Sequence, residues 1–280
     1  MLGLLGSNGA GKSTTMNILC GVLSQTEGTV HIDGIDLRKH PEEAKTRIGF
    51  LPQNAPLHLD LTVREYLTYC AHLRSINKRN IKTAVNAAME KCGVAHFRSR
   101  VINNLSGGYR QRVGIAQSII HQPKLVVLDE PTNGLDPNQI LEVRKLIKEI
   151  ATERAVIFSS HILSEVQATC DEIRMIEGGR MVFADTMTAF NNYILPNSLL
   201  VYMDNPPPVK TLAAIQGINA IEQLTDGGIR MHFDTSTKVS AKIIVMAVTN
   251  NWQLTEIMLE KSSLDEIFVQ LSNKTAEPLS

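Results

Sequence analysis

The sequence lacks a long apolar stretch and an excess of charge of either sign. Its longest run of purely apolar residues has six members, Ile243 to Val248. A membrane-spanning helix needs ~18 or more such residues. The 28 Lys and Arg residues equal the 28 Asp and Glu residues in number, whereas a chain that binds mainly nucleic acid is usually strongly basic. We therefore expect neither a membrane-spanning segment nor a nucleic-acid partner.

Paired cysteines and a leader segment are absent as well. The four cysteines are scattered and form no CxxC pair, which is typical of free thiols in a reducing compartment. The first residues, Met1 to Gly6, carry no basic side chain and run directly into a Gly-rich turn, so they do not have the pattern of a signal peptide. These absences favour a cytoplasmic protein.

The 280 residues predict about two domains at ~150 residues each. Residues 1–189 alternate short apolar strands with helical stretches, and the continuous apolar runs Leu125 to Leu128 and Ala155 to Phe158 are typical of strands buried on both faces of a parallel sheet. The pattern predicts an α/β domain with a helical insertion between about residues 54 and 121. In that insertion, Thr62 and Glu65 form a capping box that predicts the start of a helix.

Residues 190–280 differ in charge and in pattern. They carry 6 basic and 9 acidic side chains, whereas residues 1–189 carry 22 and 19. Their predicted order is strand, helix, two strands, helix and strand, which is the ferredoxin-like arrangement, followed by a final helix over 263–272. We expect a small α+β accessory domain with no second active site.

The segment from Gly6 to Ser13 fits the phosphate-binding pattern G-x-x-x-x-G-K-[ST] between a strand and a helix. Glycines let backbone N–H groups approach phosphate oxygens, and the following helix directs its N-terminus at the same anion. Lys12 is expected to reach the β and γ phosphates and the Ser13 hydroxyl to bind Mg²⁺. The residues predicted to contact nucleotide in this loop are Gly6, Ser7, Asn8, Gly9, Ala10, Gly11, Lys12, Ser13 and Thr14.

Two acidic residues follow the buried strand Leu125 to Leu128, at the strand end where ligands bind in an open α/β sheet. Asp129 suits Mg²⁺ bound through water, and Glu130 suits orienting or deprotonating an attacking water. A second anion site is predicted at Leu105 to Arg112, where Ser106 is the expected N-cap of a helix. Two phosphate-reading surfaces on one chain suggest that two chains share each nucleotide.

Taken together, these motifs resemble the ATP-binding subunits of ABC transporters. In the family's order they are Walker A (GSNGAGKST), the Q-loop (Leu51 to Gln53), the signature (LSGGYRQR), Walker B (LVVLDEP), the D-loop (Gly134 to Pro137) and the switch (Ser159 to His161). The resemblance covers residues 2 to about 180. It implies a P-loop NTPase fold of the ABC ATPase type with a helical insertion, and it implies ATP and Mg²⁺ as cofactors.

The resemblance also implies a role for each matching position. Gln53 would contact Mg²⁺ and link the site to the helical insertion, and His161 would contact the γ-phosphate. Asp136 would shape the seam of a dimer. Ser106, Gly107 and Gly108 would read the γ-phosphate held by the Walker A segment of the partner chain. Glu130, His161 and Gln53 are therefore the expected catalytic residues, and the expected Mg²⁺ ligands are Ser13, Gln53 and Asp129.

The implied function is ATP hydrolysis that drives export through a separate membrane permease. Bacterial multidrug and antibiotic exporters whose permease is another chain have segments similar to PTNGLDP, SSHILSEV and the tail ending Ser263 to Phe268. Such a subunit would be cytoplasmic and peripheral on the inner face of the membrane, and it would work as a homodimer or a heterodimer. Two alternatives are a soluble ABC ATPase unconnected to transport and an inactive, N-terminally truncated fragment.

Three further expectations concern departures from the family's pattern and a surface for the permease. Position 109 is Tyr where the general signature has Gln. Family members carry about two strands and an adenine-stacking aromatic before Walker A, so we expect the strand Leu2 to Leu5 and the hairpin Thr29 to Leu37 to have lost upstream partners. The apolar connection Asn54 to Leu59, with the helix after it to Leu73, is expected to dock the permease.

Overall fold

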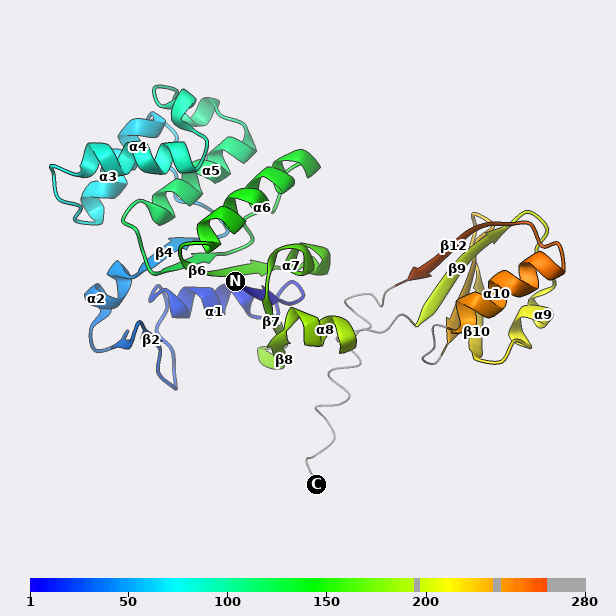
Figure 1. Cartoon of the computed structure of the whole chain (residues 1–280). Coiled ribbons are helices and arrows are strands. Elements are labelled where there is room, and N and C mark those ends of the chain that lie inside the picture. The colour runs from blue at the N-terminus through cyan, green and yellow to red at the C-terminus, as the bar shows by residue number, and fades with distance from the viewer. Residues whose placement is uncertain (194–196, 234–237, 261–280) are drawn as a thin grey trace. The chain divides into compact units, whose positions relative to one another are not determined.

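A computed structural model describes residues 1–193, 197–233 and 238–260 of the chain (Figure 1). Contacts divide the chain into two compact units, Met1–Met187 and a second unit from Thr188 onward. The helix α8 (Met187–Tyr193) begins at this boundary. Each unit is built around its own sheet and is described by itself.

The first unit contains a six-stranded sheet with the order β4-β5-β6-β1-β7-β8. The first five strands in this order pair in parallel, and β8 runs antiparallel to β7. This arrangement confirms the α/β fold expected from the continuous apolar runs. The strands are β1 (Leu2–Leu5), β4 (Ile48–Leu51), β5 (Leu125–Leu128), β6 (Ala155–Ser160), β7 (Glu172–Glu177) and β8 (Arg180–Thr186).

The expectation that β1 has lost its partners is wrong. Leu2 pairs with Ile157 of β6 on one edge and with Glu172 of β7 on the other. Both partners come from far along the chain, so β1 is a central strand of the parallel sheet. In the hairpin, β2 (His31–Ile32) and β3 (Ile35–Asp36) pair with each other, and Ile32 of β2 is buried.

Helices cover both faces of this sheet. Alternate residues of β5 divide between two cores, because Val127 packs with the cluster around α1 whereas Val126 packs with the cluster around α5 and α6. α7 approaches β1 at Gly3, where an added Cβ would overlap Val166. The helices are α1 (Lys12–Leu19), α2 (Pro41–Thr46), α5 (Gly107–Ile119), α6 (Pro137–Ala151) and α7 (Leu163–Thr169).

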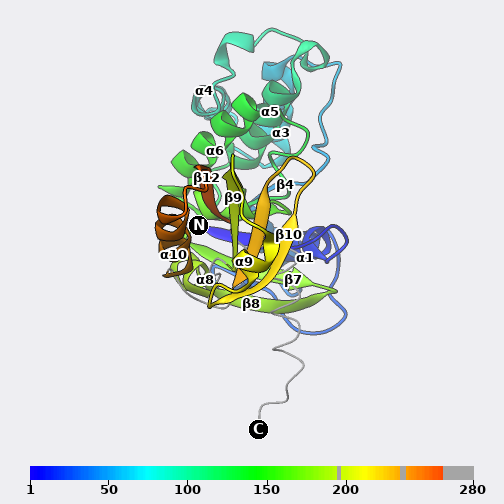
Figure 2. The same cartoon turned by 90° about the vertical axis from the view of Figure 1, so that its right-hand side faces the viewer.

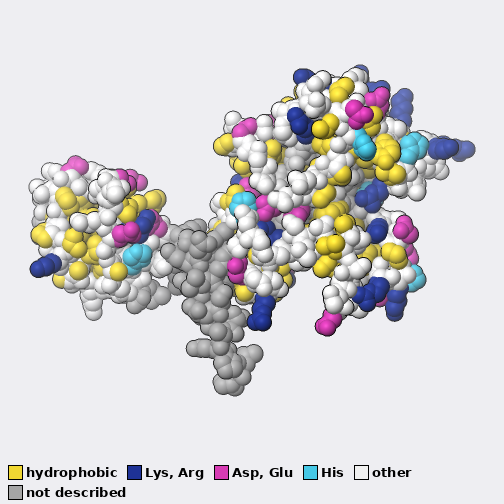
Figure 3. Space-filling view, turned by 180° about the vertical axis from the view of Figure 1, so that it is seen from behind, with side chains coloured by type: hydrophobic (Ala, Val, Ile, Leu, Met, Phe, Trp, Pro, Cys, Tyr) yellow, Lys and Arg dark blue, Asp and Glu magenta, His cyan; other side chains and the backbone are white. Residues whose placement is uncertain are grey.

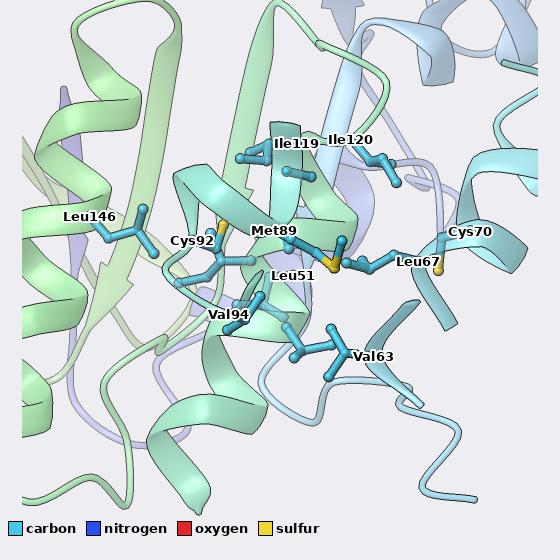
Figure 4. Close-up of a cluster of buried hydrophobic side chains, with 14 of the residues drawn as sticks. Leu51, Val63, Leu67, Cys70, Met89, Cys92, Val94, Ile119, Ile120 and Leu146 are labelled. Atoms are coloured by element: carbon cyan, nitrogen blue, oxygen red, sulfur yellow. The ribbon is translucent and has the colours of Figure 1, made fainter. Parts of the chain in front are cut away.

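The helical insertion contains α3 (Val63–Leu73) and α4 (Ile81–Lys91), followed by two short 3₁₀ turns, Ala95–Phe97 and Ile102–Asn104. The predicted capping box is present at the start of α3, where Thr62 Oγ1 accepts from Glu65 N and Glu65 Oε2 accepts from Thr62 N. Figure 4 shows side chains from α3, α4 and α5 meeting side chains of the sheet in one apolar cluster. The insertion is thereby packed as part of the first unit.

Glycines bring α5 very close to β4. An added Cβ at Gly49 would overlap the backbone carbonyl of Ser118, and one at Gly114 would lie 2.8 Å from Leu51 Cδ1. The helix that carries the signature segment at its start is therefore in direct contact with the strand that leads to Gln53.

The second unit has the ferredoxin-like topology expected from its element order. Its antiparallel sheet has the order β10-β11-β9-β12, and α9 and α10 pack on one face of it (Figures 1 and 2). The predicted final helix over 263–272 lies outside the described residues. The elements are β9 (Ser198–Met203), α9 (Val209–Ala213), β10 (Ile218–Gln223), β11 (Ile229–Phe233), α10 (Lys238–Thr249) and β12 (Leu254–Glu260).

Within the described ranges, no helix combines the length and the apolar character that crossing a membrane requires.

Candidate nucleotide-binding site

The polar residues singled out from the sequence gather at one edge of the first sheet. The phosphate loop begins at Gly6, directly after β1, and Gln53 follows β4. Asp129 follows β5, and His161 follows β6. Because these strands are parallel, all four segments leave the same, carboxyl edge of the sheet, where open α/β sheets bind ligands.

The loop from Gly6 to Lys12 has a backbone that needs glycine. Gly9 and Gly11 have φ angles of 83° and 109°, which side chains disfavour. An added Cβ at Gly6 would lie 2.5 Å from the carbonyl oxygen of Ile176. The Lys12 side chain is 5 % exposed, and its Nζ donates to Gly6 O at 2.9 Å and to Ser7 O at 3.1 Å. The loop therefore wraps around a buried cation at the start of α1.

Glu130 lies between Lys12 and His161, the two side chains expected to contact the phosphates. Its Oε1 is 3.2 Å from Lys12 Nζ, and its Oε2 is 2.9 Å from His161 Nδ1. Glu130 is 7 % exposed and has a φ angle of 47°, which is unusual for a residue with a side chain. The structure thus brings together three residues that are far apart in the sequence and holds the carboxylate in a strained backbone position.

Sequence reasoning missed the role of Ser159, which was noted only as part of the switch segment. Its hydroxyl donates to Asp129 Oδ1 at 2.6 Å and accepts from Glu130 N at 2.8 Å. Ser159 is fully buried, and Asp129 is 2 % exposed. One serine on β6 therefore orients the two neighbouring acidic residues after β5. A small polar residue at the end of an otherwise apolar strand was the available signal.

A second buried network, also missed, surrounds Glu165 in the first turn of α7. Its carboxylate accepts hydrogen bonds from Thr132 and Ser160 and forms an ion pair with Arg144. The sequence signal was weak, because an acidic residue in the first turn of a helix is ordinarily explained by the helix dipole.

Gln53 and the first two predicted signature residues have no comparable enclosure, whereas Gly108 is buried. Gln53, Ser106 and Gly107 are exposed. Ser106 is the N-cap of α5 as expected, but its side chain makes no capping hydrogen bond. A Cβ added at Gly107 would lie 3.8 Å from Leu135 Cδ2, so the signature segment starts beside the loop before α6.

Asp136 lies at the end of that loop. Its Oδ1 accepts from Gln139 N at 2.9 Å and caps α6. The side chain of Asp136 is exposed. The capping bond fixes the direction in which α6 leaves the loop, and the exposed carboxylate edge stays accessible from outside the chain.

A glycine-bounded loop around a buried lysine, followed by a helix and faced by two acidic residues, defines a P-loop nucleotide-binding protein. Residues 1–133 match the family model described as ABC transporter. The bacitracin transport ATP-binding protein BcrA of Bacillus licheniformis is 34% identical over 274 residues, covering 96% of this chain and 87% of that protein. The linearmycin resistance ATP-binding protein LnrL of Bacillus subtilis is 29% identical, with coverages of 98% and 89%.

Two solved structures are also similar. One is an ATP-binding subunit of an ABC transporter, with a TM-score of 0.61 and 27% identity, covering 69% of this chain and 81% of that one. The other is cbiO1 of Clostridium perfringens, part of the transporter complex cbiONQ, with a TM-score of 0.62, 28% identity and coverages of 68% and 78%. The chain belongs to the ABC transporter family, as an ATP-binding subunit. It binds and hydrolyses ATP.

Proposed function

We propose that this ATPase drives export of an antibiotic-like compound through a separate membrane permease, as a nucleotide-dependent dimer on the cytoplasmic face of the membrane. The observation that carries the catalytic part is the placement of Glu130 between Lys12 and His161, within 3.2 Å and 2.9 Å. The names of the bacitracin and linearmycin relatives support the export part.

The residues of the phosphate loop fit a nucleoside triphosphate. Lys12 supplies a buried ammonium for the β and γ phosphates, and the N-terminus of α1, eight residues long, directs backbone N–H groups at the same anion. We assign Gly6, Ser7, Asn8, Gly9, Ala10, Gly11 and Thr14 to the same phosphate cradle.

The oxygen-bearing side chains of this edge fit Mg²⁺, which is usually held by one or two carboxylates, hydroxyls and the substrate phosphates. Ser13, Asp129 and Gln53 would hold it. The hydrogen bond from Ser159 leaves the second oxygen of the Asp129 carboxylate for that purpose. When bound, the ion neutralises negative charge on the phosphates.

Glu130 is the proposed general base. It accepts a proton from a water whose oxygen bonds to the γ-phosphorus, and ADP leaves as the bond to its β-phosphate oxygen breaks. His161 would donate a hydrogen bond to the γ-phosphate, and its contact with Glu130 would keep the base and this donor adjacent.

A head-to-tail dimer would complete the site. Ser106 and Gly107 are exposed at the start of α5, and the phosphate loop is on the same chain. A symmetric pair of identical chains would therefore form two equivalent sites, each with the loop of one chain and Ser106, Gly107 and Gly108 of the other. The exposed Asp136 would lie at the seam.

The Glu130→Gln variant tests the catalytic and dimer assignments together. The amide keeps the size of the side chain but does not accept the proton, so turnover should fall by roughly 10²-fold or more. ATP binding should persist, and ATP should convert the variant from monomer to dimer in size-exclusion chromatography with light scattering. Lys12→Ala should instead lose ATP binding. A Glu130→Gln protein with parental turnover would refute the assignment of the base, and one that stays monomeric with ATP would refute the homodimer.

The proposed permease contact lies on the insertion. Leu57 packs partly inside the first unit, whereas Leu59, Tyr69 and Leu73 are 42%, 45% and 65% exposed. The face of the first unit in Figure 3 carries hydrophobic side chains among charged groups of both signs, so it presents no continuous basic surface. We therefore assign a protein partner to Leu59 and the exposed side of α3.

Charge substitution at Leu59 and Tyr69 tests this contact. Leu59→Glu and Tyr69→Glu should abolish nucleotide-driven transport in vesicles that contain the cognate permease, while the purified chain keeps its ATPase activity. Leu141→Glu is the matched control, because Leu141 is 62% exposed on α6. Transport that persists in both insertion variants would refute this docking surface and assign the permease contact to another part of the chain.

We assign the ferredoxin-like unit an accessory role in holding the dimer or the permease. Among the described residues there is no group of three or more His, Cys, Asp or Glu side chains that could hold a metal ion. Removing residues 190–280 should therefore spare ATP binding by the first unit and weaken assembly. A truncated chain that assembles at full strength would refute this role.

A further inference from the structure

Glu165 is a buried carboxylate whose hydrogen bonds come from three different segments. Its Oε2 accepts from Thr132 Oγ1 at 2.7 Å and from Ser160 Oγ at 2.9 Å, and its Oε1 is 3.2 Å from Arg144 Nη2. Glu165 itself is 1% exposed, and Thr132 and Ser160 are 5% and 3% exposed. A charge so enclosed is costly unless it is paired and hydrogen-bonded, so the three contacts hold Glu165 and its partners in one arrangement.

Two of these partners belong to the segments that carry catalytic groups. Ser160 precedes His161, and its hydroxyl also accepts from Ile162 N at 3.0 Å, so the backbone is fixed on both sides of the histidine. Thr132 lies in the turn after Glu130, in which Asn133 N donates to Glu130 O at 3.1 Å, and this turn leads to Asp136. A single oxygen atom of Glu165 therefore joins the His161 turn to the loop 130–136.

We propose that Glu165 is a positioning residue for ATP hydrolysis, which keeps His161 and the loop 130–136 in register without touching the nucleotide. The inference rests on the roles proposed above for His161 and Glu130. It implies that a shift of His161 is transmitted to Asp136, and so to the dimer seam, through the pair of hydroxyls on Glu165 Oε2.

A carboxylate is required for this geometry. An amide at position 165 has one acceptor oxygen. If that oxygen faces the two hydroxyls, the NH₂ group faces the Arg144 guanidinium, which has only donors. If it faces Arg144, both hydroxyls lose their acceptor. Either orientation breaks one side of the link, although the size of the side chain is unchanged.

The link predicts non-additive effects on turnover. Thr132→Val and Ser160→Ala each remove one of its two arms, so each should lower kcat by about tenfold, as misplaced catalytic groups do. The double variant should lose no more than the worse single variant, because one broken arm already separates the two segments. The Kd for ATP and the KM should change less than about twofold. Glu165→Gln should show the same pattern.

Matched controls come from α6. Glu149→Gln makes the same chemical change as Glu165→Gln at an exposed position. Thr152→Val removes a hydroxyl that, among the described residues, donates to Glu149 O at 2.8 Å. Both should keep parental kcat. Melting temperatures of all variants report folding separately from turnover.

His161→Ala separates failure of this inference from failure of the proposed function. If His161→Ala is inactive and the losses of the Thr132 and Ser160 variants multiply to about 100-fold, Glu165 has only a structural role and the inference is overturned. Unchanged kcat in Glu165→Gln overturns it as well. If His161→Ala turns over ATP at the parental rate, the role proposed for His161 is refuted and the inference falls with it.

Discussion

Replacing Ser159 by Ala removes a hydroxyl on which two functional groups depend. Ser159 Oγ donates to Asp129 Oδ1 at 2.6 Å and accepts from Glu130 N at 2.8 Å, and Ser159 is fully buried. The substitution deletes a hydrogen bond to a charged group, worth ~1.5–3 kcal/mol, and leaves a buried N–H unsatisfied at a cost of ~1–3 kcal/mol. Partial relaxation of the turn lowers the total, so we expect a loss of about 3 kcal/mol in the free energy of unfolding.

For a unit of this size, each kcal/mol corresponds to about 2–4 °C in Tm, so Ser159→Ala should melt about 6–12 °C below the parent. The chain offers a probe that separates the two units. Its single tryptophan, Trp252, is buried in the second unit. Tryptophan fluorescence should therefore report an unchanged transition, while far-UV circular dichroism reports an earlier one for the first unit.

Ser118→Ala is the matched control. Ser118 is also fully buried, but within the described part of the chain its hydroxyl bonds inside its own helix, to Ile115 O at 2.7 Å. Its loss should therefore cost no more than about 1 kcal/mol. Ser159→Ala should also raise the Mg²⁺ concentration needed for half-maximal ATPase activity about tenfold, because residues that orient a metal ligand affect affinity to that extent. Equal melting of the two variants, or an unchanged Mg²⁺ requirement, would refute the reasoning.

Three other properties follow from the structure. Gly49→Ala should lower the free energy of unfolding of the first unit by about 1–3 kcal/mol, measured by chemical denaturation. The Cβ of the alanine would overlap the Ser118 carbonyl and force α5 away from β4. Parental stability of the variant would show that the two backbones separate easily. Burial, with the charge of Arg74, lowers the pKa of His121 from 6.5 to about 4, so the folded chain binds fewer protons than the unfolded chain in this range. The free energy of unfolding should therefore fall by about 2–3 kcal/mol as pH drops from 6.5 to about 4. His121→Gln should remove most of this dependence on pH. An unchanged dependence in the variant would assign it to other titratable groups. All four cysteines are free and buried, and burial raises the pKa to about 12 for Cys20, Cys92 and Cys170. Maleimide labelling followed by mass spectrometry should find them unmodified until the chain unfolds, and rapid labelling of the native protein would contradict their burial.

Local patterns predicted the elements of this fold well. The run Leu125 to Leu128 is apolar throughout because β5 is covered on both faces, with Val126 and Val127 packing into different clusters. Thr62 and Glu65 are close in sequence, so their capping box was readable directly. The order of strands and helices after residue 197 was sufficient for the ferredoxin-like sheet, because that topology restricts which strands can pair.

Pairing and support between distant residues were not readable. Nothing in the sequence of β1 shows that it lies between β6 and β7, since a parallel strand takes partners from anywhere along the chain. Ser159 orients Glu130 from 29 residues away, and Glu165 reaches Thr132 from 33 residues away. Serine and glutamate are common on protein surfaces, so their identity alone does not mark buried roles. Motifs identified the groups proposed to meet the nucleotide, and the residues that hold those groups became visible only in the structure.

The central position of β1 has a consequence for synthesis of the chain. Leu2 pairs with Ile157 and Glu172, so a nascent chain carries β1 with both edges open until β6 and β7 have left the ribosome. At ~5–20 residues per second, this interval lasts roughly 9–35 s. Throughout it, the phosphate loop has been made but has no sheet to hold it, and the exposed edges of β1 are available to chaperones or to other unfinished chains. ATP can therefore meet a formed pocket only after the whole first unit has been translated.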